Sequence, residues 1–132
     1  MTLVDANILM YAAGREHPHK KKSVAFLERV ANGKVAAALD AEVLREILHR
    51  YHSLGRWTEG RAVYDTARIV FPEVIPVTAE VMDRARHLMD QHATLLARDA
   101  VHAAVVQVQG LASICSYDGD FDQIKGLRRI QP

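Results

Sequence analysis

The amino-acid sequence predicts an α/β fold, in which a short central parallel sheet is flanked by helices on both faces. Short apolar runs alternate with longer stretches of helical pattern along the 132 residues. This alternation is typical of parallel strands joined by helices. The short runs are continuously apolar, as expected of strands that are buried on both faces. Because the chain shows no internal repeat and no Pro/Gly/Ser-rich linker, we expect one domain over residues 1–132.

Five short strands are expected, each an apolar run that stops at a polar residue or a turn residue. Asp5 ends the first run, Asp40 ends the second, and Pro76 closes the third. The fourth run contains Cys115, and the last lies close to the end of the chain. The expected strands cover residues 2–4, 35–39, 74–75, 112–115 and 128–130.

The expected helices begin and end at local signals. The first is mostly apolar and meets no breaker before Gly14. The second starts near Pro18, a residue favoured in the first helical turn, and ends at Asn32-Gly33, a pair suited to a C-cap. Asp40 and Thr78 are suited to N-caps of later helices. The expected helices cover residues 6–13, 18–32, 40–51, 57–70, 78–91 and 97–108.

Charge balance does not identify a binding partner, but cysteine content and hydropathy indicate where the protein is located. The chain carries 17 Lys and Arg against 16 Asp and Glu, a balance that neither demands nor forbids a nucleic-acid partner. The single Cys115 excludes an internal disulfide and fits a reducing compartment. No apolar stretch is long enough for a membrane span, and the first residues lack the pattern of a signal peptide. We therefore expect a cytoplasmic protein with no membrane contact.

Acidic residues follow the strands at the edge of the sheet where chemistry is expected. In parallel sheets, ligands bind beyond the carboxyl ends of the strands. Asp5 follows the first strand, and Asp118 and Asp120 follow the strand of Cys115. Asp99 opens a helix that is apolar almost all round. Carboxylates converging there would repel one another unless a hard divalent cation such as Mg²⁺ or Mn²⁺ joined them.

The helix after Asp40 offers two glutamates, of which Glu46 is the better candidate. On a helical wheel, its apolar residues span an arc of roughly 140°. Glu46 lies roughly 60° beyond one edge of that arc and Glu42 about 100° beyond the same edge. Glu46 is therefore expected to reach inward and Glu42 to face water. The apolar residues of this helix are Val43, Leu44, Ile47, Leu48 and Tyr51.

Each of these acids also has a simpler structural explanation. Asp5 could cap the helix that follows it, and Asp99 could interact with the dipole of its helix. Glu46 could be an ordinary solvated residue, and the segment 118–122 could form a polar turn. His102, one turn after Asp99, is expected to be a core histidine with satisfied hydrogen bonds. Joint placement at the sheet end favours a shared site for the acids.

Four segments resemble, in order, the motifs of PIN-domain ribonucleases and, more narrowly, of VapC-type toxins of toxin–antitoxin pairs. They correspond to a hydrophobic-D-x-N-hydrophobic start, a V-L-x-E-hydrophobic helix, a D-A-x-x-A-A helix and an S/T-x-D-x-D-F turn. Each motif is weak alone, but four in this order and at suitable separations are specific, and the resemblance covers nearly the whole chain. The matching segments are residues 3–9, 42–48, 98–104 and 116–121.

The resemblance implies roles for residues at the matching positions. Four acids would form a catalytic quartet that binds Mg²⁺ or Mn²⁺: Asp5, Glu46, Asp99 and Asp118. Asp120 would be a further acid beside them or a ligand of a second metal ion, while Asn7 and Ser116 would be polar supports. Glu42 precedes the quartet's glutamate in the same helix, and the spacing to Val43-Leu44 selects Glu46.

The function implied is metal-assisted hydrolysis of RNA phosphodiester bonds by a toxin that pairs with an antitoxin protein and forms a homodimer. Arg15 and residues 20–22 are candidates for holding the RNA backbone, although a lysine run is also common on solvated helices. The apolar residues of 24–27 and 69–71 could serve protein contacts or could belong to the core.

Two other functions could also use acidic residues at the end of a parallel sheet. A PIN-like module could bind RNA or a partner protein without cleaving anything, but all four acidic positions are filled here. A metal-dependent phosphatase on a doubly wound sheet usually carries a second carboxylate two residues after the first, and Asn7 stands at that position. Both observations favour the ribonuclease.

Overall fold

A computed structural model describes residues 1–132, and its centre is one sheet of five parallel strands in the order β3-β2-β1-β4-β5. The elements are, in chain order, β1 (Thr2–Val4), α1 (Ala6–Ala13), α2 (Lys20–Ala31), β2 (Ala37–Asp40), α3 (Ala41–Ser53), α4 (Trp57–Val70), β3 (Val74–Ile75), α5 (Ala79–Gln91), α6 (Ala97–Gln109), β4 (Ser113–Cys115), the 3-10 helix η1 (Gly119–Gln123) and β5 (Arg129–Ile130). The predicted parallel α/β fold is therefore confirmed.

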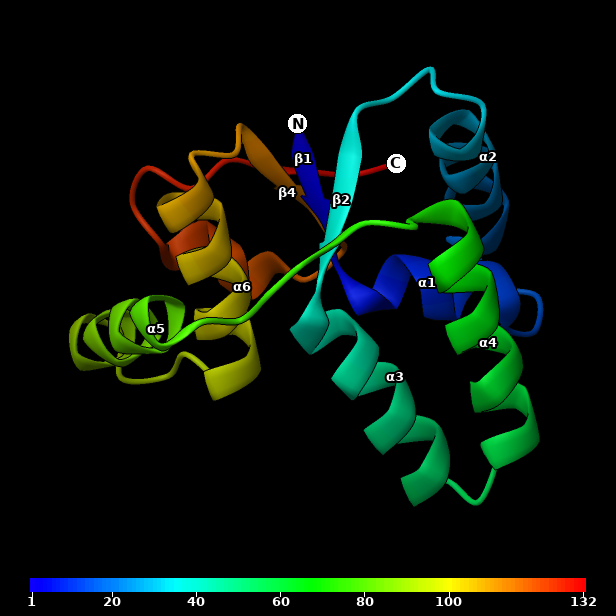
Figure 1. Ribbon diagram of the computed structural model, residues 1–132, viewed down its shortest axis with the longest axis horizontal. Helices are drawn as coiled ribbons and strands as arrows, with labels where there is room; N and C mark the ends of the chain where they lie inside the picture. Colours follow the sequence, from blue (N-terminus) through cyan, green and yellow to red (C-terminus); the bar gives the residue numbers. More distant parts are fainter.

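The two faces of the sheet are covered by different helices. In Figure 1, α5 and α6 lie on one side of the strands, and α1 to α4 lie on the other. Successive residues of a strand point to opposite faces. Accordingly, Leu3 and Ile114 pack into the core beneath α5 and α6, whereas Val4 and Cys115 pack into the core beneath α1 to α4.

The connectivity of the sheet creates a crevice beside β1. From β1 the chain proceeds through α1 and α2 to β2 on one side, while β4 pairs with β1 on the other. Such a reversal of strand order opens a crevice at the carboxyl ends of the two central strands. Asp5 N donates to Cys115 O at 3.0 Å, so β1 and β4 end side by side. Residues just beyond these two strands are therefore brought together.

Most element ends agree with the local signals of the sequence. Asp40 accepts from Val43 N at 2.9 Å as the N-cap of α3, and Thr78 caps α5 in the same way. Gly110 ends α6 with a φ of 63°, a left-handed conformation that suits glycine. The segment after β4, for which a polar turn was one alternative, forms the 3-10 helix η1 with Asp118 as its N-cap. No helix of the structure combines the length and the apolar character needed to cross a membrane.

Candidate active site

A groove of about 690 Å³ opens at the carboxyl ends of the central strands. Its lining includes Asp5, which directly follows β1, and Glu46 of α3. Asp99 in the first turn of α6 and Asp118 after β4 also line it. The four acids proposed as a quartet from the sequence therefore come from four separate segments and meet in one cavity.

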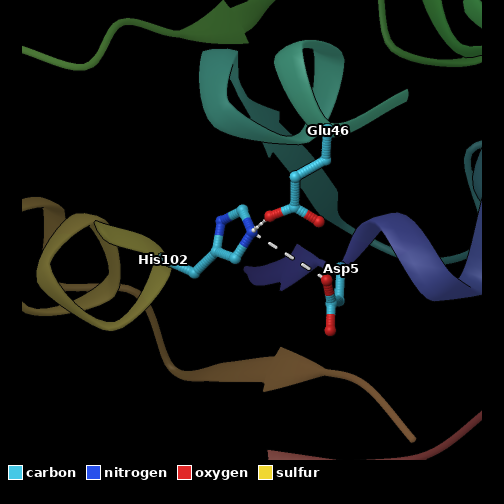
Figure 2. A group of neighbouring side chains, drawn as sticks. All are labelled: Asp5, Glu46 and His102. Carbon is cyan, nitrogen blue, oxygen red and sulfur yellow. Dashed lines mark hydrogen bonds and ion pairs between the residues drawn. The ribbon is translucent and has the colours of Figure 1, made fainter. Parts of the chain in front are cut away.

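Three side chains form the buried end of this acidic cluster: Asp5, Glu46 and His102. Figure 2 shows the imidazole of His102 pointing from α6 toward the carboxylates of the other two. His102 Nε2 lies 2.7 Å from Glu46 Oε1 and 3.9 Å from Asp5 Oδ1. Glu46 is thus held inside the groove, and the alternative of a freely solvated glutamate does not describe it.

His102 is fully buried and is held between two carboxylates. Its Nδ1 lies 2.7 Å from Asp40 Oδ2, and its Nε2 contacts Glu46. Each ring nitrogen thus lies within hydrogen-bond distance of a carboxylate oxygen, an arrangement that favours the doubly protonated imidazolium ring. Burial lowers the pKa of His102, but the charge and hydrogen bond of Asp40, together with Glu46 and Asp5, raise it well above its ordinary value.

The expected core histidine is therefore confirmed, and its partners are a finding that the sequence did not supply. Asp40 caps α3 through Oδ1 and holds His102 through Oδ2, so both of its oxygens are used. Local sequence signals predict a capping role for Asp40 but do not group it with the acids at the sheet end. The available signal was its position at the end of the second predicted strand, which resembles the position of Asp5 at the end of the first.

Ser116 fixes the orientation of Asp5. The hydroxyl of Ser116 donates to Asp5 Oδ2 at 2.5 Å and accepts from Asn7 Nδ2 at 3.1 Å and from the backbone of Asp118 at 2.9 Å. Asp5 occupies the N-cap position of α1 but makes no side-chain capping bond, so capping is not its role. Burial raises the pKa of the Asp5 carboxyl, while His102 and Ser116 oppose that rise.

A second group of carboxylates joins Asp99, Asp118 and Asp120, each of which offers one oxygen within 4.8 Å of the others. Asp99 is 2% exposed, and its buried Oδ2 has no hydrogen-bond partner. Burial, followed by the charges of Asp118 and Asp5, raises the pKa of Asp99 to about 6. Asp118 Oδ1 also accepts from Asp120 N, so the alternative of a polar turn describes part of its role.

The expected exposure of Glu42 was wrong. Its side chain is 13% exposed, as is that of Glu46, and Arg45 donates hydrogen bonds to both of its carboxylate oxygens. A helical wheel gives the direction of a side chain but not its coverage by a long neighbour on the same helix. Glu42 does not line the groove, whereas Glu46 does.

Five arginines line the walls of the groove, and only one of them was a candidate from the sequence. Of the expected basic residues, Arg15 lines the groove, while Lys20 donates to Gly14 O and Lys21 and Lys22 are exposed elsewhere. The other basic lining residues come from α3, its following loop and α6. The arginines of the groove are Arg15, Arg45, Arg50, Arg56 and Arg98.

The donor set of the groove fits a hard divalent cation. Carboxylate oxygens are the ligands that Mg²⁺ and Mn²⁺ prefer. The buried Oδ2 of Asp99 has no hydrogen-bond partner, which destabilises the metal-free fold. The negative charges of Asp118 and Asp5 beside it destabilise the ionised form of Asp99 further. A cation held among these oxygens would remove both costs.

The chain is similar to known proteins over nearly its whole length. Residues 2–127 match the PIN domain family. Ribonuclease VapC13 of Mycobacterium tuberculosis and a VapC ribonuclease of Mycobacterium bovis are each 38% identical over 130 residues, which cover 98% of this chain and 99% of the relative. Ribonuclease VapC23 of Mycobacterium tuberculosis is 34% identical over 118 residues, covering 89% and 93%.

Solved structures share the fold at lower identity. The VapBC2 complex of Rickettsia felis, bound to a promoter DNA fragment, aligns with a TM-score of 0.77 and 18% identity, covering 99% of this chain and 98% of that one. Mycobacterium tuberculosis VapC20, a toxin that cleaves the sarcin-ricin loop, aligns with a TM-score of 0.74 and 22% identity over the whole of both chains. At these identities the likeness concerns the fold alone.

Proposed function

We propose that this chain, which belongs to the PIN-domain family and within it to the VapC ribonucleases, hydrolyses RNA phosphodiester bonds with a divalent metal as the toxin of a toxin–antitoxin pair. The observation that carries the proposal is the convergence of four carboxylates from separate segments in one groove with arginine walls. The PIN domain of this proposal spans residues 1–132, and its place of action is the cytoplasm.

The residues that would hold Mg²⁺ or Mn²⁺ are Asp5, Glu46, Asp99 and Asp118. Asp120 lies close enough to Asp99 and Asp118 to share in that site or in a second one. When bound, a divalent cation offsets negative charge on a phosphodiester and lowers the pKa of water. This choice of residues rests on their joint lining of the groove and on the family motifs that they match.

The chain's own residues bind the substrate and position the acids. Arg45 and Arg56 are engaged by Glu42 and Glu59, whereas Arg15 and Arg50 are paired with no carboxylate. The two unpaired guanidinium groups are available to bind RNA phosphates, which strengthens association in a salt-dependent manner. RNA can thereby enter a groove whose floor is acidic.

Two hydrogen-bonded supports keep the carboxylates in place. Ser116, itself held by Asn7, orients Asp5, and His102, itself held by Asp40, orients Glu46. Partners of this kind fix the direction of a metal ligand and tune its basicity. Neither Ser116 nor His102 needs to touch the substrate for this role.

Metal dependence is the first test of the proposal. Purified protein incubated with mixed RNA is expected to cleave it in Mg²⁺ or Mn²⁺, and excess EDTA is expected to reduce cleavage to background because the acids alone cannot offset the charge of the phosphate. Gel analysis of the products measures this, with Glu46→Gln protein purified in parallel to reveal contaminating ribonuclease. Cleavage undiminished by EDTA would rule out the mechanism, and RNA binding without cleavage would favour the non-catalytic module.

A second prediction tests the support of Asp5. Ser116→Ala is expected to lower cleavage by about 10- to 100-fold and to weaken Mn²⁺ binding, because Asp5 loses its hydroxyl donor. Calorimetric titration with Mn²⁺ and single-turnover kinetics measure the two effects. Ser113→Ala, a change at a buried serine at the opposite end of β4, is the matched control. Unchanged metal affinity in Ser116→Ala would show that Ser116 is not needed to position Asp5.

The proposed partners are RNA, an antitoxin protein and a second copy of the chain. The Rickettsia felis structure and a Klebsiella pneumoniae neighbour are toxin–antitoxin assemblies, which supports the antitoxin. An apolar groove of about 480 Å³ between α1, α2 and α4 offers a protein partner a surface. Of the apolar residues considered for such contacts, Phe26, Leu27 and Phe71 belong to the core, whereas Ile69 is 80% exposed.

A further inference from the structure

Four aromatic rings gather beside the acidic groove, drawn from three segments of the chain. Tyr11 belongs to α1, His17 and His19 lie in the connection to α2, and Tyr117 stands between the site residues Ser116 and Asp118. The rings of His19 and Tyr117 are stacked, with centroids 3.7 Å apart and an interplanar angle of 11°. The rings of Tyr11 and Tyr117 form a T-shaped pair with centroids 5.5 Å apart, and the ring centroids of His17 and Tyr11 are 4.5 Å apart.

The outer two rings of this ring cluster face the groove. Tyr11 and His17 line the same cavity as the four acids. On α1 the groove is lined by Ala6 at the start of the helix and then by Asn7, Met10 and Tyr11, while Ile8 and Leu9 point into the core. Tyr11 therefore lies one helical turn beyond the support residue Asn7, on the wall that leads out of the acidic site.

The ring cluster is not explained by core packing. His17 is exposed, and neither it nor Tyr11 belongs to either hydrophobic core cluster; only Tyr117 packs partly against one of them. The cluster contains two of the four tyrosines and two of the seven histidines of the chain, so aromatic rings are concentrated at this place. The ring of His17 is also oriented by a hydrogen bond, since its Nδ1 accepts from the backbone N–H of His19 at 3.1 Å. The ring of His17 therefore lines the groove and stays exposed to solvent.

We propose that Tyr11 and His17, backed by His19 and Tyr117, form a base-stacking subsite that receives an unpaired base of the RNA beside the phosphate at the acids. Ordered aromatic rings bind bases through their faces, which every base has and which duplex pairing hides. Arg15, which also lines this wall, is placed to bind a phosphate flanking the stacked base. The subsite rests on the proposed ribonuclease function and adds a requirement for an unpaired nucleotide at a defined place.

The test uses single-stranded RNA that carries the fluorescent base 2-aminopurine, titrated with full-length protein in EDTA so that binding is read without cleavage. Stacking on the subsite is expected to quench the fluorescence, and His17→Ala is expected to remove the quench and to weaken binding by about tenfold. His17→Phe, which retains a ring, is expected to restore both. Because His17 is exposed, these changes leave the core intact.

His87→Ala is the matched control, because His87 is an exposed histidine on α5 that does not line the groove. It is expected to bind and quench as the parent does, and the same RNA annealed into a duplex is expected to give no quench. Equal behaviour of His17→Ala and the parent would overturn the subsite while leaving cleavage untouched. Absence of both RNA binding and metal-dependent cleavage would overturn the ribonuclease proposal itself.

Discussion

Glu46→Gln is expected to reduce RNA cleavage by about a thousandfold or more, because a carboxylate that would hold the cation is lost and with it several kcal/mol of charge stabilisation. Glu42→Gln is expected to keep most of the activity of the parent. Both glutamates lie on α3 with side chains 13% exposed, but Glu46 lines the groove and contacts His102, whereas Glu42 pairs with Arg45 and does not line the groove. Initial rates on one RNA at saturating Mg²⁺ or Mn²⁺ measure the difference.

The pair of variants is matched in residue type, helix and burial, so a difference between them reports position alone. The amide oxygen of Gln at position 46 can still accept a hydrogen bond from His102, and thermal melts of both variants are expected to remain close to the parent. If Glu42→Gln were the inactive variant, the assignment of the quartet's glutamate would be reversed. Equal activity of both variants would remove α3 from the site.

Asp99→Asn is expected to abolish cleavage to a similar degree and, without metal, to make the fold more stable. Burial and the charges of Asp118 and Asp5 raise the pKa of Asp99 to about 6 from an ordinary value of 3.8. A difference of roughly two pKa units corresponds to a cost on the order of 2–3 kcal/mol for ionising this carboxyl in the folded state. An amide avoids that cost, so the metal-free variant is expected to melt several degrees above the parent.

The metal-free parent is expected to lose stability as the pH rises, because Asp99 ionises more readily in the unfolded chain. At a pH well below 3.8, Asp99 is protonated in both the folded and the unfolded chain and contributes nothing to the pH dependence of stability. As the pH rises from about 4 to about 6, the unfolded chain ionises first, so the metal-free parent loses stability, and the loss is complete above about pH 6. Mg²⁺ or Mn²⁺ binds the ionised folded state, so it is expected to stabilise the parent more at pH 8 than at pH 5.

Thermal melts of both proteins at the two pH values, with and without metal, measure these effects. Asp65→Asn, a change at an exposed acid of α4, is the control for replacing a carboxylate in general and is expected to melt with the parent at both pH values. A metal-free Asp99→Asn protein that melts well below the parent would show that Asp99 mainly stabilises the start of α6. In that case the shared acidic site would lose its central residue.

The sequence predicted the arrangement of strands and helices because its signals are local. Apolar runs define strands, and caps such as Asp40, Thr78 and Gly110 act within a few residues of their own position. The groove acids were also predictable, since a parallel sheet gathers whatever follows its central strands at one edge. Asp5 and Asp118 meet the other acids there for that reason, although their roles in cleavage remain a prediction.

Only the tertiary structure decided which side chains touch. The contacts of His102 with Asp40 and Glu46 join positions 62 and 56 residues apart, and they depend on how α6 packs beside α3. The pairing of Glu42 with Arg45 likewise follows from side-chain conformation, which a helical wheel does not contain. Hydrophobic periodicity places a residue on a face of its own element, whereas hydrogen-bond partners are set by the distance between elements. The distance between two elements is set only when the core packs, so the sequence pattern of either element alone does not contain it.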